Sequence, residues 1–358
     1  MRVLQFLTHL NVGGIPTYVY NLTKYLLANG IEVAVASSGG EWEEEFKRLG
    51  VKTYRLPIKA KSELSLKVFL SALDLAKIHK DFAFDIIHSH TRVTQVAAQL
   101  YSNFSGIPHI ANFHGFYEKN KKRVGRRIFK AYGNLAIAIT PETGQTLIEC
   151  FKVPQNKVRV ILSAIDFTRL NDLSKPLPLS GGLRIGASGR LSSVKGFHYL
   201  IEAMPQIIRR HPDAFLYIMG KGPQEQELVQ KAIDLNIFNR LVIIKDQPLS
   251  SFLRSVNIFC LPSLEEPLGL SVLEAQYFGL PCVVSDAGGL KILVEDGVSG
   301  MIVPRADAQA IAEAIDRLAS DEALRKTIST NCRKNVLENF DLSRKVEEFI
   351  KVYREVLE

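Results

Sequence analysis

The sequence predicts an α/β protein with two domains, each built on a parallel β-sheet. The chain has 358 residues, of which 46% are hydrophobic, enough to bury two cores of ordinary size. Short apolar segments alternate with amphipathic ones throughout, a pattern typical of parallel sheets covered by helices. Residues 166–182 separate two series of such segments, and their prolines, glycines and serines indicate a loop. We therefore expect one domain before this linker and one after it.

The first series begins with an apolar strand over residues 2–7. A helix is expected next, because Ile15, Val19 and Leu26 recur at helical spacing. Pro16 can start this helix and Gly30 can end it. The remaining apolar runs of this half predict strands at 32–37, 85–88, 109–113, 135–139 and 158–162, and the amphipathic segments predict helices at 64–80 and 140–150.

The second series begins after the linker. Its apolar runs predict strands at 183–187, 215–219, 241–244, 257–261 and 282–284. Helical spacing predicts closing helices at 307–319, 322–338 and 341–358.

Charge is divided unevenly between the halves. Residues 1–165 hold 22 Lys and Arg against 12 Asp and Glu, and the remainder holds 23 against 25. We expect the first half to face something anionic. The four cysteines show no C-x-x-C spacing, and no signal peptide or long apolar run is present, so we expect a cytoplasmic protein with reduced thiols.

The most basic stretch is residues 119–130, with seven Lys and Arg among twelve residues and no acid. Cations in this number can hold a protein reversibly on the anionic cytosolic face of a membrane. A solvated basic face is the alternative. Nucleic acid is not expected as a partner, because aromatic residues are not interleaved with the cations and no nucleic-acid motif occurs.

Two carboxylates surround the predicted start of a helix in residues 263–289. Glu266 falls in a loop containing Pro267 and Gly269, and Glu274 falls in the helix expected from about Ser271. The first N–H groups of a helix attract anions, above all phosphate. A glutamate on either side suits hydroxyl groups that flank a phosphate. Two surface acids near a helix start are the alternative.

This stretch resembles the E-x7-E signature of the retaining glycosyltransferases of family 4, also called glycosyl transferases group 1. Residues 189–196 are similar to the G-R-x4-K-G motif of the same family, and the resemblance extends over essentially the whole chain. It implies the GT-B fold, with two Rossmann-like domains facing a central cleft. The domains would be residues 1–165 and 183–340, with residues 341–358 returning to the first.

The resemblance also implies roles for individual residues. Arg190 and Lys195 would neutralise the donor diphosphate, helped by the helix start at Gly269 and Leu270. Glu266 would bind the sugar hydroxyls and Glu274 the ribose.

Further contacts come from strand ends. Gly13 and Gly14 resemble the glycine loop near the diphosphate and the acceptor, although a plain turn requiring positive φ is an equal alternative. Lys245 would contact the nucleotide, and His114 would face the transferred sugar. His88 and His90 resemble a D-x-x-H-x-H segment, and we expect them to be hydrogen-bonded partners at a strand end instead of metal ligands.

Together these residues predict a retaining glycosyltransferase that needs no metal and no cofactor besides its nucleoside-diphosphate sugar. The charge distribution and the resemblance favour a lipid-linked, lipopolysaccharide or other cell-surface glycan as acceptor. Two alternatives remain open on the sequence: a GT-B sugar-nucleotide epimerase, and a non-catalytic membrane-associated module that binds sugar nucleotides.

Overall fold

The chain folds into two compact units in the computed structural model, which describes residues 1–358 except 12, 116–129 and 173. The first unit comprises Met1–Ala164 and Leu342–Glu358, and the second comprises Ile165–Asp341. Each is described by itself below.

The described residues of the first unit form a seven-stranded sheet in the order β3-β2-β1-β4-β5-β6-β7, with every pair parallel. Its strands are β1 (Arg2–Phe6), β2 (Glu32–Ser37), β3 (Lys52–Arg55), β4 (Ile86–Ser89), β5 (His109–Phe113), β6 (Leu135–Ala138) and β7 (Val158–Val160). Its helices are α1 (Gly14–Ala28), α2 (Glu43–Arg48), α3 (Leu66–Asp81), α4 (Arg92–Ser105), α7 (Pro141–Glu149) and α15 (Leu342–Glu355).

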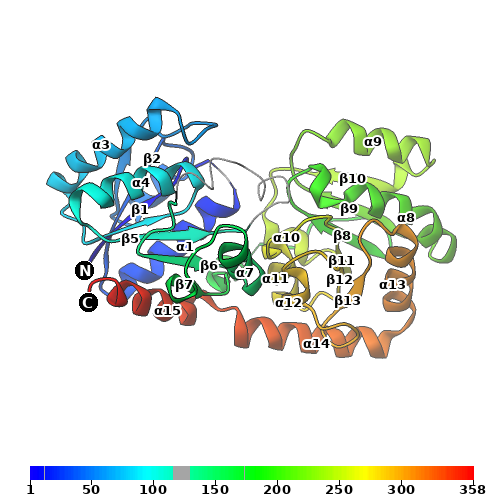
Figure 1. The fold of residues 1–358 in the computed structure, drawn as a ribbon. Helices are drawn as coiled ribbons and strands as arrows, with labels where there is room; N and C mark the ends of the chain where they lie inside the picture. Colours follow the sequence, from blue (N-terminus) through cyan, green and yellow to red (C-terminus); the bar gives the residue numbers. More distant parts are fainter. Residues whose placement is uncertain (12, 116–129, 173) are drawn as a thin grey trace. The chain divides into compact units, whose positions relative to one another are not determined.

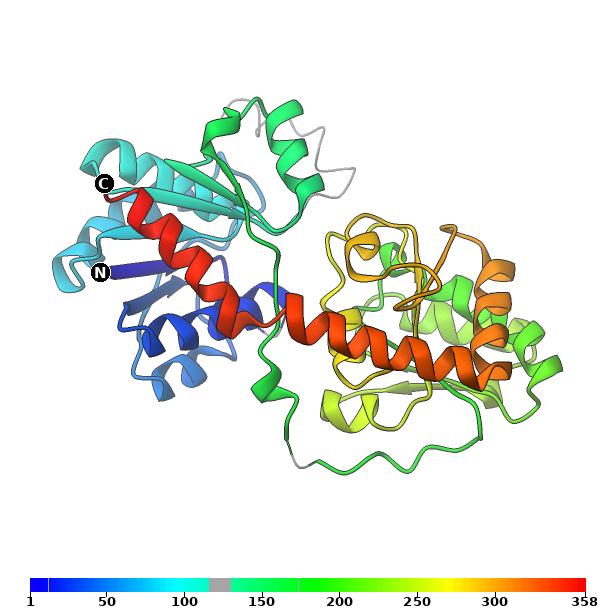
Figure 2. The ribbon, with the colours of Figure 1, turned by 90° about the horizontal axis from the view of Figure 1, so that it is seen from below.

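Helices cover both faces of this sheet (Figure 1). Alternate residues of the strands point to opposite faces, so Val3 packs with α1 and α15 on one side while Leu4 packs with α3 and α4 on the other. The C-terminal helix α15 buries Phe349 and Tyr353 in the first of these layers. Figure 2 shows α15 lying along this unit, with both chain termini beside it.

The second unit has a six-stranded parallel sheet in the order β10-β9-β8-β11-β12-β13. Its strands are β8 (Arg184–Ser188), β9 (Phe215–Met219), β10 (Leu241–Ile244), β11 (Ile258–Leu261), β12 (Cys282–Ser285) and β13 (Met301–Val303). Its helices are α8 (Phe197–Arg210), α9 (Glu225–Asp234), α10 (Leu249–Leu253), α11 (Leu270–Tyr277), α12 (Leu290–Leu293), α13 (Ala308–Ser320) and α14 (Glu322–Asn339).

Residues 166–182, expected as a linker, belong to the second unit and are hydrogen-bonded to it. Ser250 donates to the Asp172 carboxylate at 2.5 Å, and the Leu177 N–H donates to Ser255 at 2.6 Å. Phe167 stacks on Tyr277 with ring centroids 4.8 Å apart. The segment therefore runs along the surface of the second unit instead of standing free of it.

Both sheets reverse their strand order at the same place. In the first unit β4 lies beside β1, and in the second β11 lies beside β8. Open parallel sheets bind ligands at the carboxyl ends of the strands at such a reversal. We therefore expect ligand-binding residues in the loops after β1, β4, β8 and β11.

Candidate active site

Glu266 and Lys195 form an ion pair at the strand reversal of the second unit. Lys195 lies in a short 3₁₀ turn after β8, and Glu266 lies in the loop after β11. The Lys195 ammonium donates to Oε2 of Glu266, and the Ser263 hydroxyl donates to the same oxygen at 3.1 Å. Only 8% of Glu266 is exposed. Two of the predicted site residues, 71 positions apart in sequence, are thus in direct contact.

Glycine at position 196 makes this contact possible. Gly196 has φ +65°, and a Cβ placed on it would lie 2.0 Å from the carbonyl oxygen of Pro262. The loop after β8 therefore lies directly against the loop after β11, and the Leu264 N–H donates to the Val194 carbonyl at 2.8 Å. This close approach brings the ammonium and the carboxylate together.

The start of α11 lies in the same loop. Gly269 precedes the helix with φ +101°, and a Cβ on it would lie 2.6 Å from the Leu290 side chain. The Gly289 N–H donates to the Glu266 carbonyl at 3.0 Å and fixes the loop from its other side. The N–H groups of the first turn, beginning at Leu270, have no acceptors within the helix. They form a partial positive charge close to the ion pair.

Three further predicted residues of this unit lie in separate surroundings. Arg190, two positions after β8, is exposed. Lys245, directly after β10, pairs with Glu225 at 2.6 Å. Glu274 lies in α11, where burial raises the pKa of its carboxyl to about 7, against the opposing effect of Arg169. The structure gives no direct contact from these three to the Lys195–Glu266 pair, and their roles stay predictions.

The glycine pair of the first unit does not fit the alternative of a turn that requires positive φ. Gly13 precedes α1 in an extended conformation with φ 166°, which any residue adopts, and Gly14 is the first residue of α1. A Cβ on Gly14 would meet nothing within 4 Å. Neither the backbone conformation nor the packing of the chain requires glycine here, so the two positions leave open space at the start of α1.

His114 follows β5 and is held by polar side chains. Its Nε2 lies 3.2 Å from Nδ1 of His90 and 3.0 Å from Nδ2 of Asn112. The ring of Tyr18 packs edge-on against it, with centroids 5.0 Å apart. Burial lowers the pKa of His114 to about 3, so the imidazole is neutral at physiological pH.

The two histidines of β4 connect this site to the C-terminal helix. Nε2 of His90 lies 2.6 Å from Oε1 of Gln5, and Nδ1 of His88 lies 2.8 Å from the hydroxyl of Tyr353 in α15. Gln5 also donates to that hydroxyl at 3.4 Å. His88 and His90 are hydrogen-bonded side chains, as expected from the sequence. The predictions missed Gln5 and Tyr353, although a glutamine within an apolar strand is a signal of a buried polar contact.

Two kinds of feature are absent from residues 1–11, 13–115, 130–172 and 174–358, the part of the chain that the structure describes. No group of three or more His, Cys, Asp or Glu side chains there could hold a metal ion. No helix there is long and apolar enough to cross a membrane. The basic segment 119–130 lies outside the described residues apart from Lys130.

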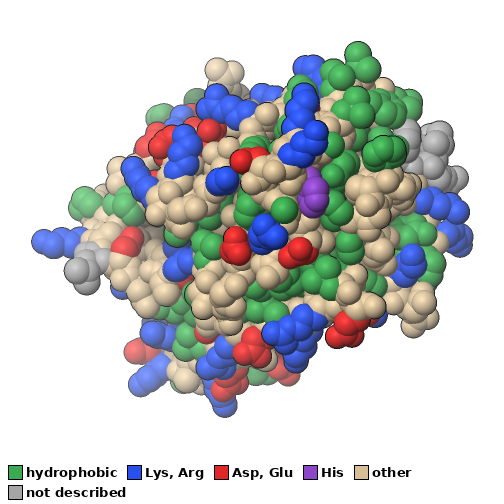
Figure 3. All heavy atoms as spheres, turned by 90° about the vertical axis from the view of Figure 1, so that its left-hand side faces the viewer, with side chains coloured by type: hydrophobic (Ala, Val, Ile, Leu, Met, Phe, Trp, Pro, Cys, Tyr) green, Lys and Arg blue, Asp and Glu red, His purple; other side chains and the backbone are tan. Residues whose placement is uncertain are grey.

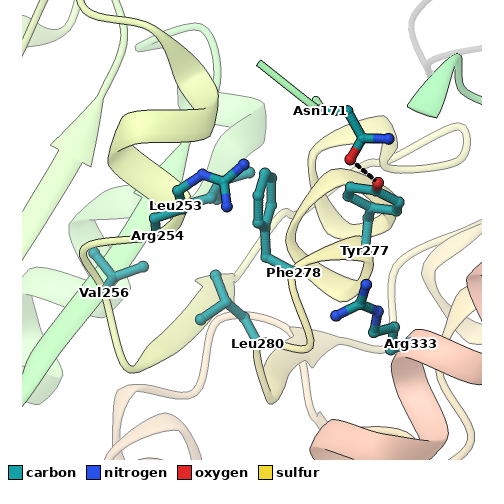
Figure 4. Close-up of a pocket in the computed structure, with 8 residues that line it drawn as sticks. All are labelled: Asn171, Leu253, Arg254, Val256, Tyr277, Phe278, Leu280 and Arg333. Atoms are coloured by element: carbon teal, nitrogen blue, oxygen red, sulfur yellow. Dashed lines mark hydrogen bonds between the residues drawn. The ribbon is translucent and has the colours of Figure 1, made fainter. Parts of the chain in front are cut away.

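A separate pocket of about 410 Å³ opens on the opposite edge of the second sheet (Figure 4). Val256 and Leu280 line it just before β11 and β12, whereas the predicted site residues follow strand ends. The Arg254 guanidinium donates to the Leu170 carbonyl at 3.4 Å and to the Asp172 carbonyl at 3.2 Å. Arg254 therefore ties Leu170 and Asp172 to this part of the second unit, and the lining of the pocket includes none of the predicted site residues.

Comparison with known proteins identifies the family. A model described as glycosyltransferase family 4 matches residues 12–169, and one described as glycosyl transferases group 1 matches residues 172–335. The chain belongs to the group 1, family 4 glycosyltransferases. Its two parallel-sheet Rossmann-like units are those of the GT-B fold, as the sequence predicted.

Proteins and solved structures that are similar to this glycosyltransferase match most of its length. An uncharacterized glycosyltransferase of Methanocaldococcus jannaschii is 28% identical over 376 residues, 97% of this chain and 95% of its own. The UDP-Gal:alpha-D-GlcNAc-diphosphoundecaprenol alpha-1,3-galactosyltransferase of Escherichia coli is 26% identical over 327 residues, 85% of this chain and 84% of its own. The structure of Anabaena HepE with UDP-glucose matches at TM-score 0.85 and 20% identity, covering 99% of this chain and all of that one.

Proposed function

We propose that this glycosyltransferase moves a sugar from a nucleoside-diphosphate sugar to an acceptor hydroxyl with retention of the anomeric configuration. The observation that carries the proposal is the Lys195–Glu266 ion pair at the strand reversal of the second unit, beside the start of α11. It combines a cation for phosphate, a carboxylate for hydroxyl groups and helix N–H groups for an anion. The Escherichia coli relative takes UDP-Gal, and Anabaena HepE binds UDP-glucose, which supports a donor of this class.

The donor diphosphate would be held by Lys195, Arg190 and the first N–H groups of α11. The Lys195 ammonium has three N–H donors and gives one to Glu266, so two remain for phosphate oxygens. Negative charge grows on the diphosphate as the glycosidic bond breaks, so these groups stabilise the transition state more than the bound donor. In this proposal they supply the charge neutralisation that a divalent ion supplies in other transferases.

Glu266 and Glu274 would orient the donor through its hydroxyl groups. A carboxylate accepts two hydrogen bonds from a sugar diol, and Glu266 is already fixed by Lys195 and Ser263. Glu274, whose pKa is about 7, would accept from the ribose when it is ionised. His114, held neutral, would contact the transferred sugar without adding charge.

Retention would follow from substitution on one face of the sugar. The bond between the anomeric carbon and the diphosphate oxygen breaks, and the bond to the acceptor oxygen forms on the same face. The acceptor proton passes to the departing diphosphate oxygen. No protein nucleophile is required, so Glu266 acts in binding and orientation.

The acceptor would be a lipid-linked, lipopolysaccharide or other cell-surface glycan reached at the cytosolic face of a membrane. The excess of cations in residues 1–165 supports an anionic partner for the first unit. The Escherichia coli relative acts on a sugar carried by diphosphoundecaprenol. A glycan attached to a lipid diphosphate combines both properties.

The experiment is a screen of nucleoside-diphosphate sugars by thermal shift, followed by measurement of nucleoside diphosphate release with a panel of lipid-linked acceptors. We expect Glu266→Gln and Lys195→Met each to lower kcat/KM by about 10–100-fold, from the loss of one charge-assisted contact. Lys221→Met is the matched control, because Lys221 pairs with Asp246 on the surface of the same unit.

Four outcomes would contradict the proposal. Unchanged turnover in Glu266→Gln and Lys195→Met would reject the proposed roles of these two residues. Product formed without an acceptor would indicate an epimerase, and donor binding without turnover across the panel would indicate a binding module. Inversion at the anomeric carbon, read from the product's NMR coupling constant, would reject the retaining mechanism.

A further inference from the structure

Helix α3 exposes an apolar stripe to solvent. Five of the thirteen large hydrophobic residues that are exposed in the described chain lie in residues 64–73: Leu64, Leu66, Phe69, Leu70 and Leu73. Leu66 and Leu73 are 70% and 69% exposed. In Figure 3, which faces the end of the first unit carrying α3 and α4, hydrophobic side chains gather at the upper right beside Lys and Arg side chains.

The stripe is separate from the face that α3 buries. Val68, Leu75 and Ile78 pack into the core against the sheet. Leu66, Leu70 and Leu73 recur every three or four residues on the opposite side, and the same line continues to Lys77 and Lys80. The outward face of α3 is therefore apolar over its first two turns and carries Lys77 and Lys80 over its last, beside acids that are paired.

The apolar end of α3 lies at the edge of the sheet that carries the predicted acceptor site. The helix runs antiparallel to the parallel strands, so its first turns lie near their carboxyl ends. Arg92, just after β4, pairs at 3.2 Å with Glu63, next to Leu64. Burial, and after it the charge of Lys59, lower the pKa of His9 in the loop that leads to Gly13.

We propose that the exposed face of α3, with Leu64, inserts into the surface of an anionic lipid bilayer and holds the first unit on the membrane. An interfacial helix binds by burying its apolar face at the boundary between headgroups and acyl chains, while lysines reach the headgroups. Lys61 before the helix and Lys80 at its end are both exposed and would supply these contacts. This surface is distinct from the basic segment 119–130 and does not require the proposed glycosyl transfer.

The charges favour a bilayer over a second copy of the chain. Cations stand at both ends of the stripe, at Lys61 and at Lys80. Two copies paired through this face would bring cations against cations whether the helices ran parallel or antiparallel. The two acidic side chains of α3, Asp74 and Asp81, are paired with Lys77 at 2.7 Å and with Lys52 at 3.3 Å. An anionic surface satisfies both ends at once.

The test is sedimentation of the full-length protein with vesicles of phosphatidylcholine containing phosphatidylglycerol. We expect Leu66→Gln/Leu70→Gln/Leu73→Gln to reduce the apparent partition coefficient at least about tenfold at low and at high salt, because buried apolar area is lost. Lys61→Gln/Lys80→Gln should weaken binding at low salt only. The control is Ile233→Gln/Phe238→Gln, which removes two apolar residues of the second unit that are 47% and 56% exposed and should bind normally.

Several results would overturn the inference. Vesicle binding by the leucine variant equal to that of the wild type would reject it, and so would a dimer in the wild type that the leucine variant converts to a monomer. Circular dichroism checks that the variant is folded. Thermal stabilisation by a nucleoside-diphosphate sugar should be the same in both proteins. If no nucleoside-diphosphate sugar stabilises the wild-type protein, the proposed function is rejected, whereas the inference of membrane binding is unaffected.

Discussion

Lys195→Met would leave the Glu266 carboxylate in a nearly closed site without its cation. Glu266 is 8% exposed, and the Ser263 hydroxyl would be its remaining side-chain partner among the described residues. Removing one member of a buried ion pair costs about 3–5 kcal/mol, and the remaining hydrogen bond offsets about 1 kcal/mol of that cost. We therefore expect the second unit to lose about 2–4 kcal/mol of unfolding free energy, equivalent to about 4–16 °C in Tm for a domain of this size.

The double variant Lys195→Met/Glu266→Gln separates stability from function. It has no buried charge, and its amide oxygen still accepts from Ser263, so we expect most of the lost stability to return. Turnover should not return, because both the cation for the diphosphate and the carboxylate for the sugar are gone. A role confined to folding would restore turnover together with stability.

Calorimetry measures the unfolding of these variants, and Trp42 provides an internal control. Trp42 is the one tryptophan in the sequence and lies in the first unit, with its ring 4.8 Å from that of Tyr20. Its fluorescence in native conditions should be the same in all four proteins. A Tm for Lys195→Met within 1 °C of the wild type would refute the reasoning about a buried pair. So would a loss of unfolding free energy in the double variant equal to the sum of the losses in the two single variants.

Three further predictions follow from burial. Burial lowers the pKa values of His88, His90 and His109, so below pH 6.5 the unfolded chain binds protons that the folded chain does not. Each histidine should therefore remove about 1.4 kcal/mol of unfolding free energy per pH unit as the pH falls. Measurement of the unfolding free energy as a function of pH tests this loss. Because the pKa of Glu274 is raised to about 7, affinity for a nucleoside-diphosphate sugar should rise about tenfold between pH 6 and pH 8, and Glu274→Gln should flatten this profile in calorimetric titrations. Gly196→Ala should cost about 2–4 kcal/mol and abolish donor binding, because its Cβ collides with the Pro262 carbonyl.

Controls and contrary results distinguish these outcomes. Gly30→Ala has a similar φ of +74° with open space around its Cβ, so it should cost only about 1 kcal/mol. Equal losses in the two glycine variants would contradict the role of close loop contact. Stability independent of pH between 6.5 and 4 would mean that the buried histidines titrate normally. A pH profile that persists in Glu274→Gln would assign the titration to another group.

The strands were predictable because their burial is local in sequence. The expected runs at 32–37, 109–113, 215–219 and 241–244 coincide with β2, β5, β9 and β10. The start of α11 was also predictable, because the loop glycine and the apolar spacing after it indicate a helix that begins close to Leu270. An apolar run between turn residues is sufficient for such elements, because one short segment contains the whole signal.

The buried polar contacts could not be predicted in the same way. Gln5 and Tyr353 are 348 residues apart, and only the docking of α15 on the first sheet brings Tyr353 to His88. The resemblance of two motifs assigned Lys195 and Glu266 to one site but did not predict their ion pair, and composition and spacing could not place one loop against the other. For Gly13, the sequence left open a turn at positive φ, and the extended backbone at that residue excludes it.

The two strand reversals of this enzyme provide different electrostatic surroundings, which bears on how one reaction could use both. In the second unit an ammonium, a carboxylate and a helix start lie together after β8 and β11. In the first unit His90 follows β4 and His114 follows the neighbouring strand β5, and burial lowers the pKa values of both far below neutrality. A charged imidazole attracts phosphate, whereas a neutral one can only exchange hydrogen bonds with groups such as hydroxyls. In the role proposed for His114, its neutral ring would therefore contribute hydrogen bonds and no charge.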